Sequence, residues 1–169
     1  VTSEQVAEVT NSPTALIVLS AVAYRSGYLS DVPAVTALAH EHGALVLWDV
    51  CHSVGVIARQ LDEWRVDLAI GCTYKYLNGG PGSPAFGYVR TELQDRLRQP
   101  IQGWMGSAEP FAMAKHYTPS DGIRRFLSGT PSILGMLDMK DMLALIEQAG
   151  LDAIRAKSVA LTEFAVQIS

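Results

Sequence analysis

The stretch ALVLWD, residues 44–49, is a run of five apolar residues that ends in a carboxylate. A short continuous apolar run that follows a turn residue, here Gly43, is typical of a strand buried on both faces of a parallel sheet. The runs ALIVLS at 15–20 and DLAIGC at 67–72 have a similar character, and PAFGYV at 84–89 is a fourth candidate. We therefore predict strands at these four places.

Helical patterns separate and follow these runs. Ser30 is placed to cap a helix that extends to about His42, and a shorter helix is predicted at 91–98. The first of these helices has an apolar face made of Val32, Val35, Leu38 and Ala39. Alternating strands and helices predict an α/β fold with a mostly parallel sheet, in which short connections allow one antiparallel pair.

The remainder of the chain has a different pattern. Residues 99–129 are irregular but rich in aromatic side chains, as in a functional loop rather than a disordered one. Thr130 and Pro131 are of the types favoured at the N-cap and first position of a helix, which we expect to end at Gly150. A last helix is predicted from Leu151 onward.

The composition is that of a folded chain without a strong charge. Of 169 residues, 49% are hydrophobic, and 13 basic against 17 acidic residues give a net charge of −4. This acidity argues against a nucleic-acid partner, and no apolar run reaches the roughly 20 residues that cross a bilayer. No secretory leader is visible and two cysteines are few, so we expect a cytoplasmic protein. Because the chain opens at Val1 and closes inside a helical pattern, we expect a piece of a longer protein.

Polar residues at the carboxyl ends of the predicted strands are the first candidates for a site, because ligands of parallel sheets bind there. Ser20, Asp49 and His52 lie at two such ends. A carboxylate after a buried strand needs a partner, which could equally be a helix terminus or a cation. His52 taken alone is more typical of a structural histidine.

Lys75 follows the third predicted strand, within TYKYLNGGPG at 73–82. A lone lysine is usually a solvated charge, and the glycine-rich segment could be a plain turn. Burial between two tyrosines would instead favour a neutral, nucleophilic amine. The segment matches neither nucleotide-binding glycine motif.

Asp49 and Lys75 together indicate a specific type of binding site, which neither residue indicates alone. Pyridoxal phosphate needs a lysine that binds its aldehyde and a carboxylate that keeps its pyridine nitrogen protonated. Two neighbouring strands that end in an aspartate and a lysine supply this pair. No metal is expected, because Cys51 and Cys72 form no C-x₂-C pair and His40 and His42 look like the solvated end of a helix.

Two motifs, WDVCHSVG at 48–55 and TYKYLNGGPGS at 73–83, resemble those of kynureninases, which are fold-type-I pyridoxal phosphate enzymes related to class V aminotransferases. The resemblance implies the three-layer αβα large domain of the aspartate aminotransferase type. It assigns residues 1–150 to that domain and residues 151–169 to the start of a helix leading to a small domain. A kynureninase is more than twice as long as this chain.

The resemblance also implies roles for individual residues. Lys75 corresponds to the lysine that binds the cofactor, Asp49 to the partner of the pyridine nitrogen, and Tyr74 to a phosphate ligand and possible proton donor. His52 and Ser20 correspond to positions that contact the cofactor. Two more positions, Trp104 and Thr130, correspond to residues that reach the phosphate of the neighbouring subunit in a homodimer.

The implied activity is hydrolysis of L-kynurenine, or its 3-hydroxy form, to an anthranilate and L-alanine, in tryptophan degradation or NAD biosynthesis. Another class V enzyme, such as a cysteine desulfurase or an aminotransferase, is the nearest alternative. A desulfurase needs a mobile catalytic cysteine, and neither Cys51 nor Cys72 lies in an obvious flexible loop. A non-catalytic interaction fragment is the alternative from a different class.

Overall fold

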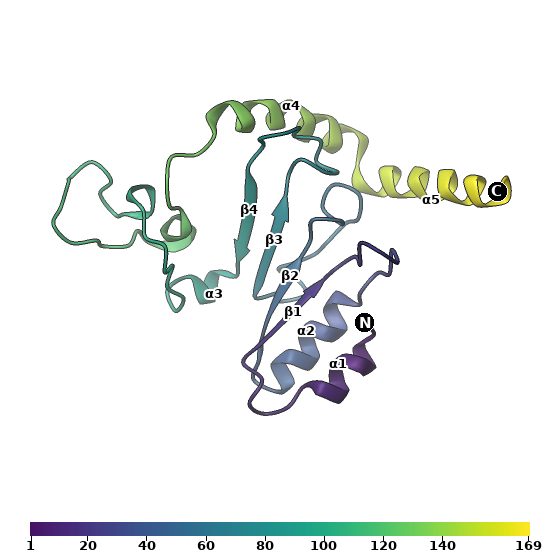
Figure 1. The fold of residues 1–169 in the computed structure, drawn as a ribbon, viewed down its shortest axis with the longest axis horizontal. Helices are drawn as coiled ribbons and strands as arrows, with labels where there is room; N and C mark the ends of the chain where they lie inside the picture. The colour runs from purple at the N-terminus through teal and green to yellow at the C-terminus, as the bar shows by residue number, and fades with distance from the viewer.

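A four-stranded sheet in the order β1-β2-β3-β4 is the centre of the structure, a computed structural model that describes residues 1–169 (Figure 1). β1 (Leu16–Ser20), β2 (Leu45–Asp49) and β3 (Leu68–Cys72) are parallel, and β4 (Ala85–Val89) is antiparallel to β3. Each strand begins within one residue of its predicted start and ends at the predicted residue. The predicted α/β class and mostly parallel sheet are confirmed.

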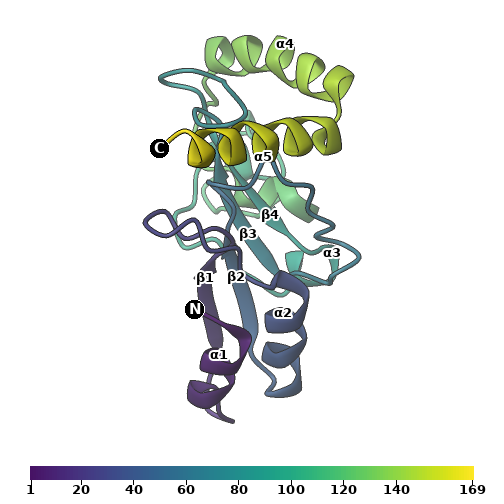
Figure 2. The same ribbon diagram turned by 90° about the vertical axis from the view of Figure 1, so that its right-hand side faces the viewer.

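Four of the seven helices lie in two groups. Two of them pack side by side against one face of the sheet, and two longer ones lie near the carboxyl ends of the parallel strands (Figures 1 and 2). None is both long and apolar enough to cross a membrane. In chain order the helices are α1 (Ser3–Val9), α2 (Val32–Glu41), α3 (Thr91–Gln94), the 3₁₀ helices η1 (Trp104–Gly106) and η2 (Gly122–Phe126), α4 (Ile133–Ala149) and α5 (Leu151–Gln167).

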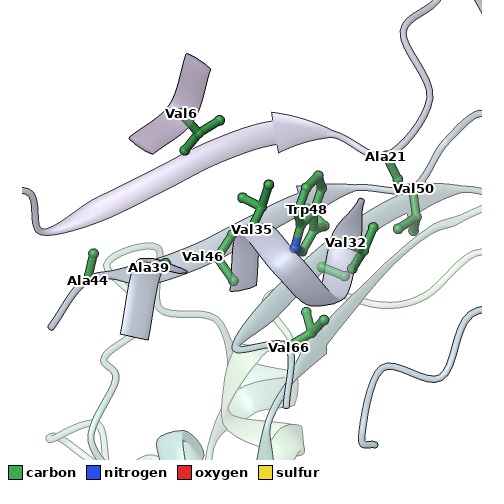
Figure 3. Packing of buried hydrophobic residues seen from close by; sticks show 11 residues of the cluster. Val6, Ala21, Val32, Val35, Ala39, Ala44, Val46, Trp48, Val50 and Val66 are labelled. Atoms are coloured by element: carbon green, nitrogen blue, oxygen red, sulfur yellow. The ribbon is translucent and has the colours of Figure 1, made fainter. Parts of the chain in front are cut away.

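The hydrophobic core lies between α2 and the sheet (Figure 3). Trp48 of β2 is fully buried there, and its indole Nε1–H donates to the hydroxyl of Thr36 on α2 at 3.1 Å. Val32 and Val35 of α2 and Val46 of β2 complete the contact. This packing fixes β2, and therefore the position of its carboxyl end.

The opposite face of the sheet is covered only in part. Leu16 and Val18 of β1 and Ile70 of β3 are each between 44% and 56% exposed on it. The apolar character of these strands predicts burial on both faces of the sheet. The residues of this chain bury only one of the two faces fully.

Several helix boundaries differ from the predictions. Asp31, rather than Ser30, caps α2, because its carboxylate accepts the N–H of Ala34 at 3.0 Å. The predicted helix start at Pro131 is wrong, since Ser132 is the N-cap and α4 begins at Ile133. The helix predicted at 91–98 is shorter and ends at Gln94. α1 was not predicted, although Thr2 and Gln5 form a capping box.

Candidate active site

Asp49 is held at the carboxyl end of β2 by two hydrogen bonds. It lies opposite Ser20 in the parallel register of β1 and β2, and the Ser20 hydroxyl donates to its Oδ2 at 3.4 Å. The backbone N–H of Cys51 donates to Oδ1 at 2.8 Å, which closes an Asx turn as the chain leaves the strand. The strand end therefore orients the carboxylate.

These contacts keep the carboxyl group ionised. Partial burial acts to raise the pKa of Asp49, but the hydrogen bonds from Cys51 and Ser20 and the nearby charge of His52 outweigh it and lower the pKa below its usual value. Asp49 is therefore a carboxylate at neutral pH, suited to hold a cation or a protonated ring nitrogen.

The loop after β2 packs directly against the loop after β3. Gly55 has a φ of +88°, and a Cβ there would lie 2.7 Å from the carbonyl oxygen of Tyr76, so only glycine allows this approach. The packing brings His52 next to Lys75, with 3.1 Å between His52 Nε2 and Lys75 Nζ. Both side chains are half-buried.

Lys75 is carried by a tight, internally bonded turn. The Gly79 N–H donates to the carbonyl oxygen of Thr73 at 2.9 Å, and a Cβ at Gly79 would lie 2.8 Å from the Cβ of Ser83. Tyr74 is 56% exposed, and its ring centre lies 5.6 Å from Lys75 Nζ. The turn thus presents an amine and a phenol at the carboxyl-terminal end of the sheet, the end at which Asp49 also lies.

The structure brings five of the seven predicted site residues to this edge, namely Ser20, Asp49, His52, Tyr74 and Lys75. The other two lie in the segment that follows β4. Trp104 belongs to η1, is 44% exposed and packs edge-to-face on Phe111, with ring centres 5.5 Å apart. Thr130 is exposed between η2 and α4. Neither contacts the Asp49 and Lys75 group within this chain.

Neither cysteine is a nucleophile in this arrangement. Cys72 is buried in β3, and the pKa of Cys51 is raised to about 12 by burial, by its hydrogen bond to Asp49 and by Cys72. A thiol of that pKa is almost wholly protonated at neutral pH and therefore unreactive. No group of three or more metal-binding side chains is present.

Two contributors to the site were not predicted. One is the Cys51 N–H, which fixes Asp49, and the other is Gly55, which lets the two loops meet. An aspartate directly after a predicted strand is of the type that favours an Asx turn, which is the sequence signal for the first of these contacts. Nothing in the sequence indicates which segment Gly55 approaches.

The aminotransferase class-V family model matches residues 1–168 of this chain. Among curated relatives, the kynureninase of Pseudomonas fluorescens is 43% identical over 165 residues, which is 98% of this chain and 40% of that protein. The kynureninase of Burkholderia mallei (strain SAVP1) is 47% identical over 150 residues, 89% of this chain and 36% of that protein. The chain thus spans about 40% or less of the length of these relatives.

Solved structures with a similar fold include a cysteine desulfurase and an aminotransferase. The apo structure of a cysteine desulfurase from Thermococcus onnurineus NA1 matches with a TM-score of 0.78 at 23% identity, covering 98% of this chain and 40% of that chain. An alanine–glyoxylate aminotransferase from Nostoc sp. matches with a TM-score of 0.63 at 25% identity, covering 89% and 39%. These likenesses support the fold, while the kynureninases share far more of the sequence.

Proposed function

Because the chain belongs to the aminotransferase class-V family, we propose that it carries the cofactor-binding core of a kynureninase. The reaction is the hydrolysis of L-kynurenine, or 3-hydroxy-L-kynurenine, to anthranilate, or 3-hydroxyanthranilate, and L-alanine. The observation that carries the proposal is the placement of an ionised Asp49 and a His52-bound Lys75 at one edge of the sheet. The identity of 43–47% to kynureninases supports this choice of substrate.

The residues at this edge fit pyridoxal phosphate. The Cys51 N–H and the Ser20 hydroxyl keep Asp49 ionised, as a partner of a protonated pyridine nitrogen must be. Gly55 and Gly79 sit where a Cβ would collide with backbone or with Ser83, so the two loops close tightly around the lysine. When bound, pyridoxal phosphate supplies an electron sink for bonds broken at the substrate's α-carbon.

The side chains of this chain then have distinct tasks. The carboxylate of Asp49 accepts the N–H of the cofactor ring and holds its proton there. The Nζ of Lys75 would hold the cofactor and would serve as the base that accepts the proton of the substrate α-carbon. His52, 3.1 Å from that amine, orients it and can exchange a proton with it.

The remaining predicted residues belong to the same proposal. The hydroxyl of the exposed Tyr74 would bind the phosphate and would donate a proton to the β-carbon when the Cβ–Cγ bond breaks, while water supplies the hydroxyl group that the γ-carbon gains. Trp104 and Thr130, which contact neither Asp49 nor Lys75 here, reach the cofactor phosphate of the other subunit in a homodimer. The exposure of the segment that carries them supports this assignment.

We further propose the setting of the enzyme. Residues 1–150 form part of the cofactor-binding large domain, and residues 151–169 begin the helix toward a small domain. The protein acts in the cytoplasm, in tryptophan degradation or NAD biosynthesis. Its two unpaired cysteines support a reducing compartment.

The test is a product assay with the purified full-length protein and pyridoxal phosphate. Release of anthranilate and alanine from L-kynurenine, with no sulfide from cysteine and no amino transfer to a keto acid, supports the proposal. Sulfide release would instead identify a desulfurase, although the protonated Cys51 and the buried Cys72 do not favour one. Cofactor binding without any turnover would favour a non-catalytic module.

A further inference from the structure

Thr73 lies between the end of β3 and the turn that carries Lys75, and it is only 2% exposed. Its backbone carbonyl oxygen accepts the N–H of Gly79 at 2.9 Å, and this hydrogen bond closes the turn. Its hydroxyl donates to the carbonyl oxygen of Pro84, the residue directly before β4. The hydroxyl of Thr73 therefore ties together the two ends of the segment 74–83, which contains Lys75.

The residue type of Pro84 accounts for the use of a side-chain donor at this place. In the antiparallel register of β3 and β4, Cys72 is paired with Ala85. Thr73 and Pro84 are therefore the next two residues to face each other. Proline has no backbone N–H, so the ladder of backbone hydrogen bonds cannot take a donor from Pro84. The Thr73 hydroxyl supplies a donor instead and holds the two segments together for one more residue.

The position of the Lys75 amine depends on this closed segment. Lys75 lies two residues beyond Thr73, inside the turn. Its Nζ reaches Nε2 of His52 because the turn packs against the loop after β2, where Gly55 lies close to the carbonyl oxygen of Tyr76. A turn that opened at its base would lose this packing, and the amine would move away from His52.

We propose that Thr73 is a positioning residue for Lys75, whose amine it keeps in the place where pyridoxal phosphate binds. The inference rests on the proposed function and adds to it a residue that acts only through Lys75. The hydroxyl of Thr73 has one hydrogen, which it donates to Pro84, so none is left for a ligand. A hydroxyl with a purely structural role would affect stability alone, whereas a positioning hydroxyl also affects the reaction of Lys75 with the cofactor.

The test measures, in the full-length protein, the concentration of pyridoxal phosphate at which borohydride traps half of Lys75, as quantified by peptide mass spectrometry. Thr73→Val removes the hydroxyl and keeps the shape of the side chain. It should raise this concentration about tenfold, and with saturating cofactor it should lower kcat on L-kynurenine more than it changes KM. Thr73→Ser keeps the hydroxyl and should stay close to the wild type. Thr73→Ala removes the same hydroxyl and takes the place of the valine variant if that variant does not fold.

Thr10→Val is the matched control. Thr10 is also buried and its hydroxyl also donates to a backbone carbonyl oxygen, that of Val6 at 2.7 Å, but it is the C-cap of α1 and takes no part in the candidate active site. Both valine variants should lose stability, and only Thr73→Val should impair the trapping of Lys75.

Three outcomes would contradict these expectations. Equal trapping by Thr73→Val and the wild type would overturn the inference and leave the proposed function intact. Equal impairment by Thr10→Val would show a general effect of lost stability and would also overturn the inference. If no pyridoxal phosphate is trapped on Lys75 of the wild type, the proposed function is itself wrong, and the inference with it.

Discussion

Lys75 Nζ and His52 Nε2 are 3.1 Å apart, although 23 residues separate them in the chain. The contact exists because two loops at the carboxyl ends of neighbouring parallel strands pack together through Gly55. This contact connects the Lys75 amine to the turn that begins at Asp49.

In the full-length protein, replacing Lys75 by alanine should remove the visible absorption band of protein-bound pyridoxal phosphate and abolish turnover of L-kynurenine. The reason is that no other amine lies beside His52 to bind the cofactor. Absorbance spectroscopy of the purified variant, before and after borohydride, checks this. The exposed Lys140 of α4 provides the control, since Lys140→Ala should keep the band. A spectrum unchanged by Lys75→Ala would refute the assignment.

Asp49→Ala should lower kcat on L-kynurenine by at least 10²-fold, since the ring nitrogen loses the anion that keeps it protonated. Steady-state kinetics with saturating cofactor measure this loss. Ser20→Ala should have a smaller effect, because the Cys51 N–H still orients the carboxylate at 2.8 Å. Turnover of Asp49→Ala close to that of the wild type would contradict the role given to Asp49.

Asp49 should also make stability depend on pH. Its pKa is lowered in the folded protein, so it binds fewer protons there than in the unfolded chain, whose aspartates titrate at about 3.9. Its contribution to stability is therefore present above about pH 4 and is lost as the pH falls through the folded value. The Tm advantage of the wild type over Asp49→Asn should shrink with falling pH. An advantage that does not change between pH 7 and pH 2.5 would show that the lowered pKa is wrong.

Trp104 should act across subunits. A mixture of Trp104→Ala and Lys75→Ala proteins, unfolded and refolded together, should regain part of the activity that each lacks alone, because mixed dimers contain one intact site. Activity of the refolded mixture measures this, with each variant refolded separately as the control. If mixed dimers form and no activity returns, both residues serve the same site.

The buried hydrogen bond between Trp48 and Thr36 should contribute to the free energy of unfolding. Thr36→Val leaves the buried indole N–H without a partner and should lower the free energy of unfolding by about 1–3 kcal/mol. Urea denaturation measures the change. Thr36→Ser keeps the hydroxyl and should lose less. If the two variants are equally destabilised, packing rather than the hydrogen bond accounts for the cost.

Local pattern was sufficient to predict the strands and the residues at their ends. A continuous apolar run favours a buried strand whatever surrounds it, so β1 to β4 and the positions of Asp49 and Lys75 follow from residues close in sequence. Helix ends were less certain, because Ser30 and Asp31 are both good caps and only the hydrogen bond to Ala34 selects Asp31.

The tertiary structure alone decided the contacts between distant segments. His40, predicted to lie on the solvated end of a helix, instead contacts the fully buried Asp67 at 2.8 Å, where Arg90 and the Val46 N–H also bind. The tertiary structure alone also decides the approach of His52 to Lys75 and the burial of the Tyr117 hydroxyl without a partner. Such contacts depend on strand order and loop packing, which are set by burial over the whole sheet and leave no periodic trace in the sequence.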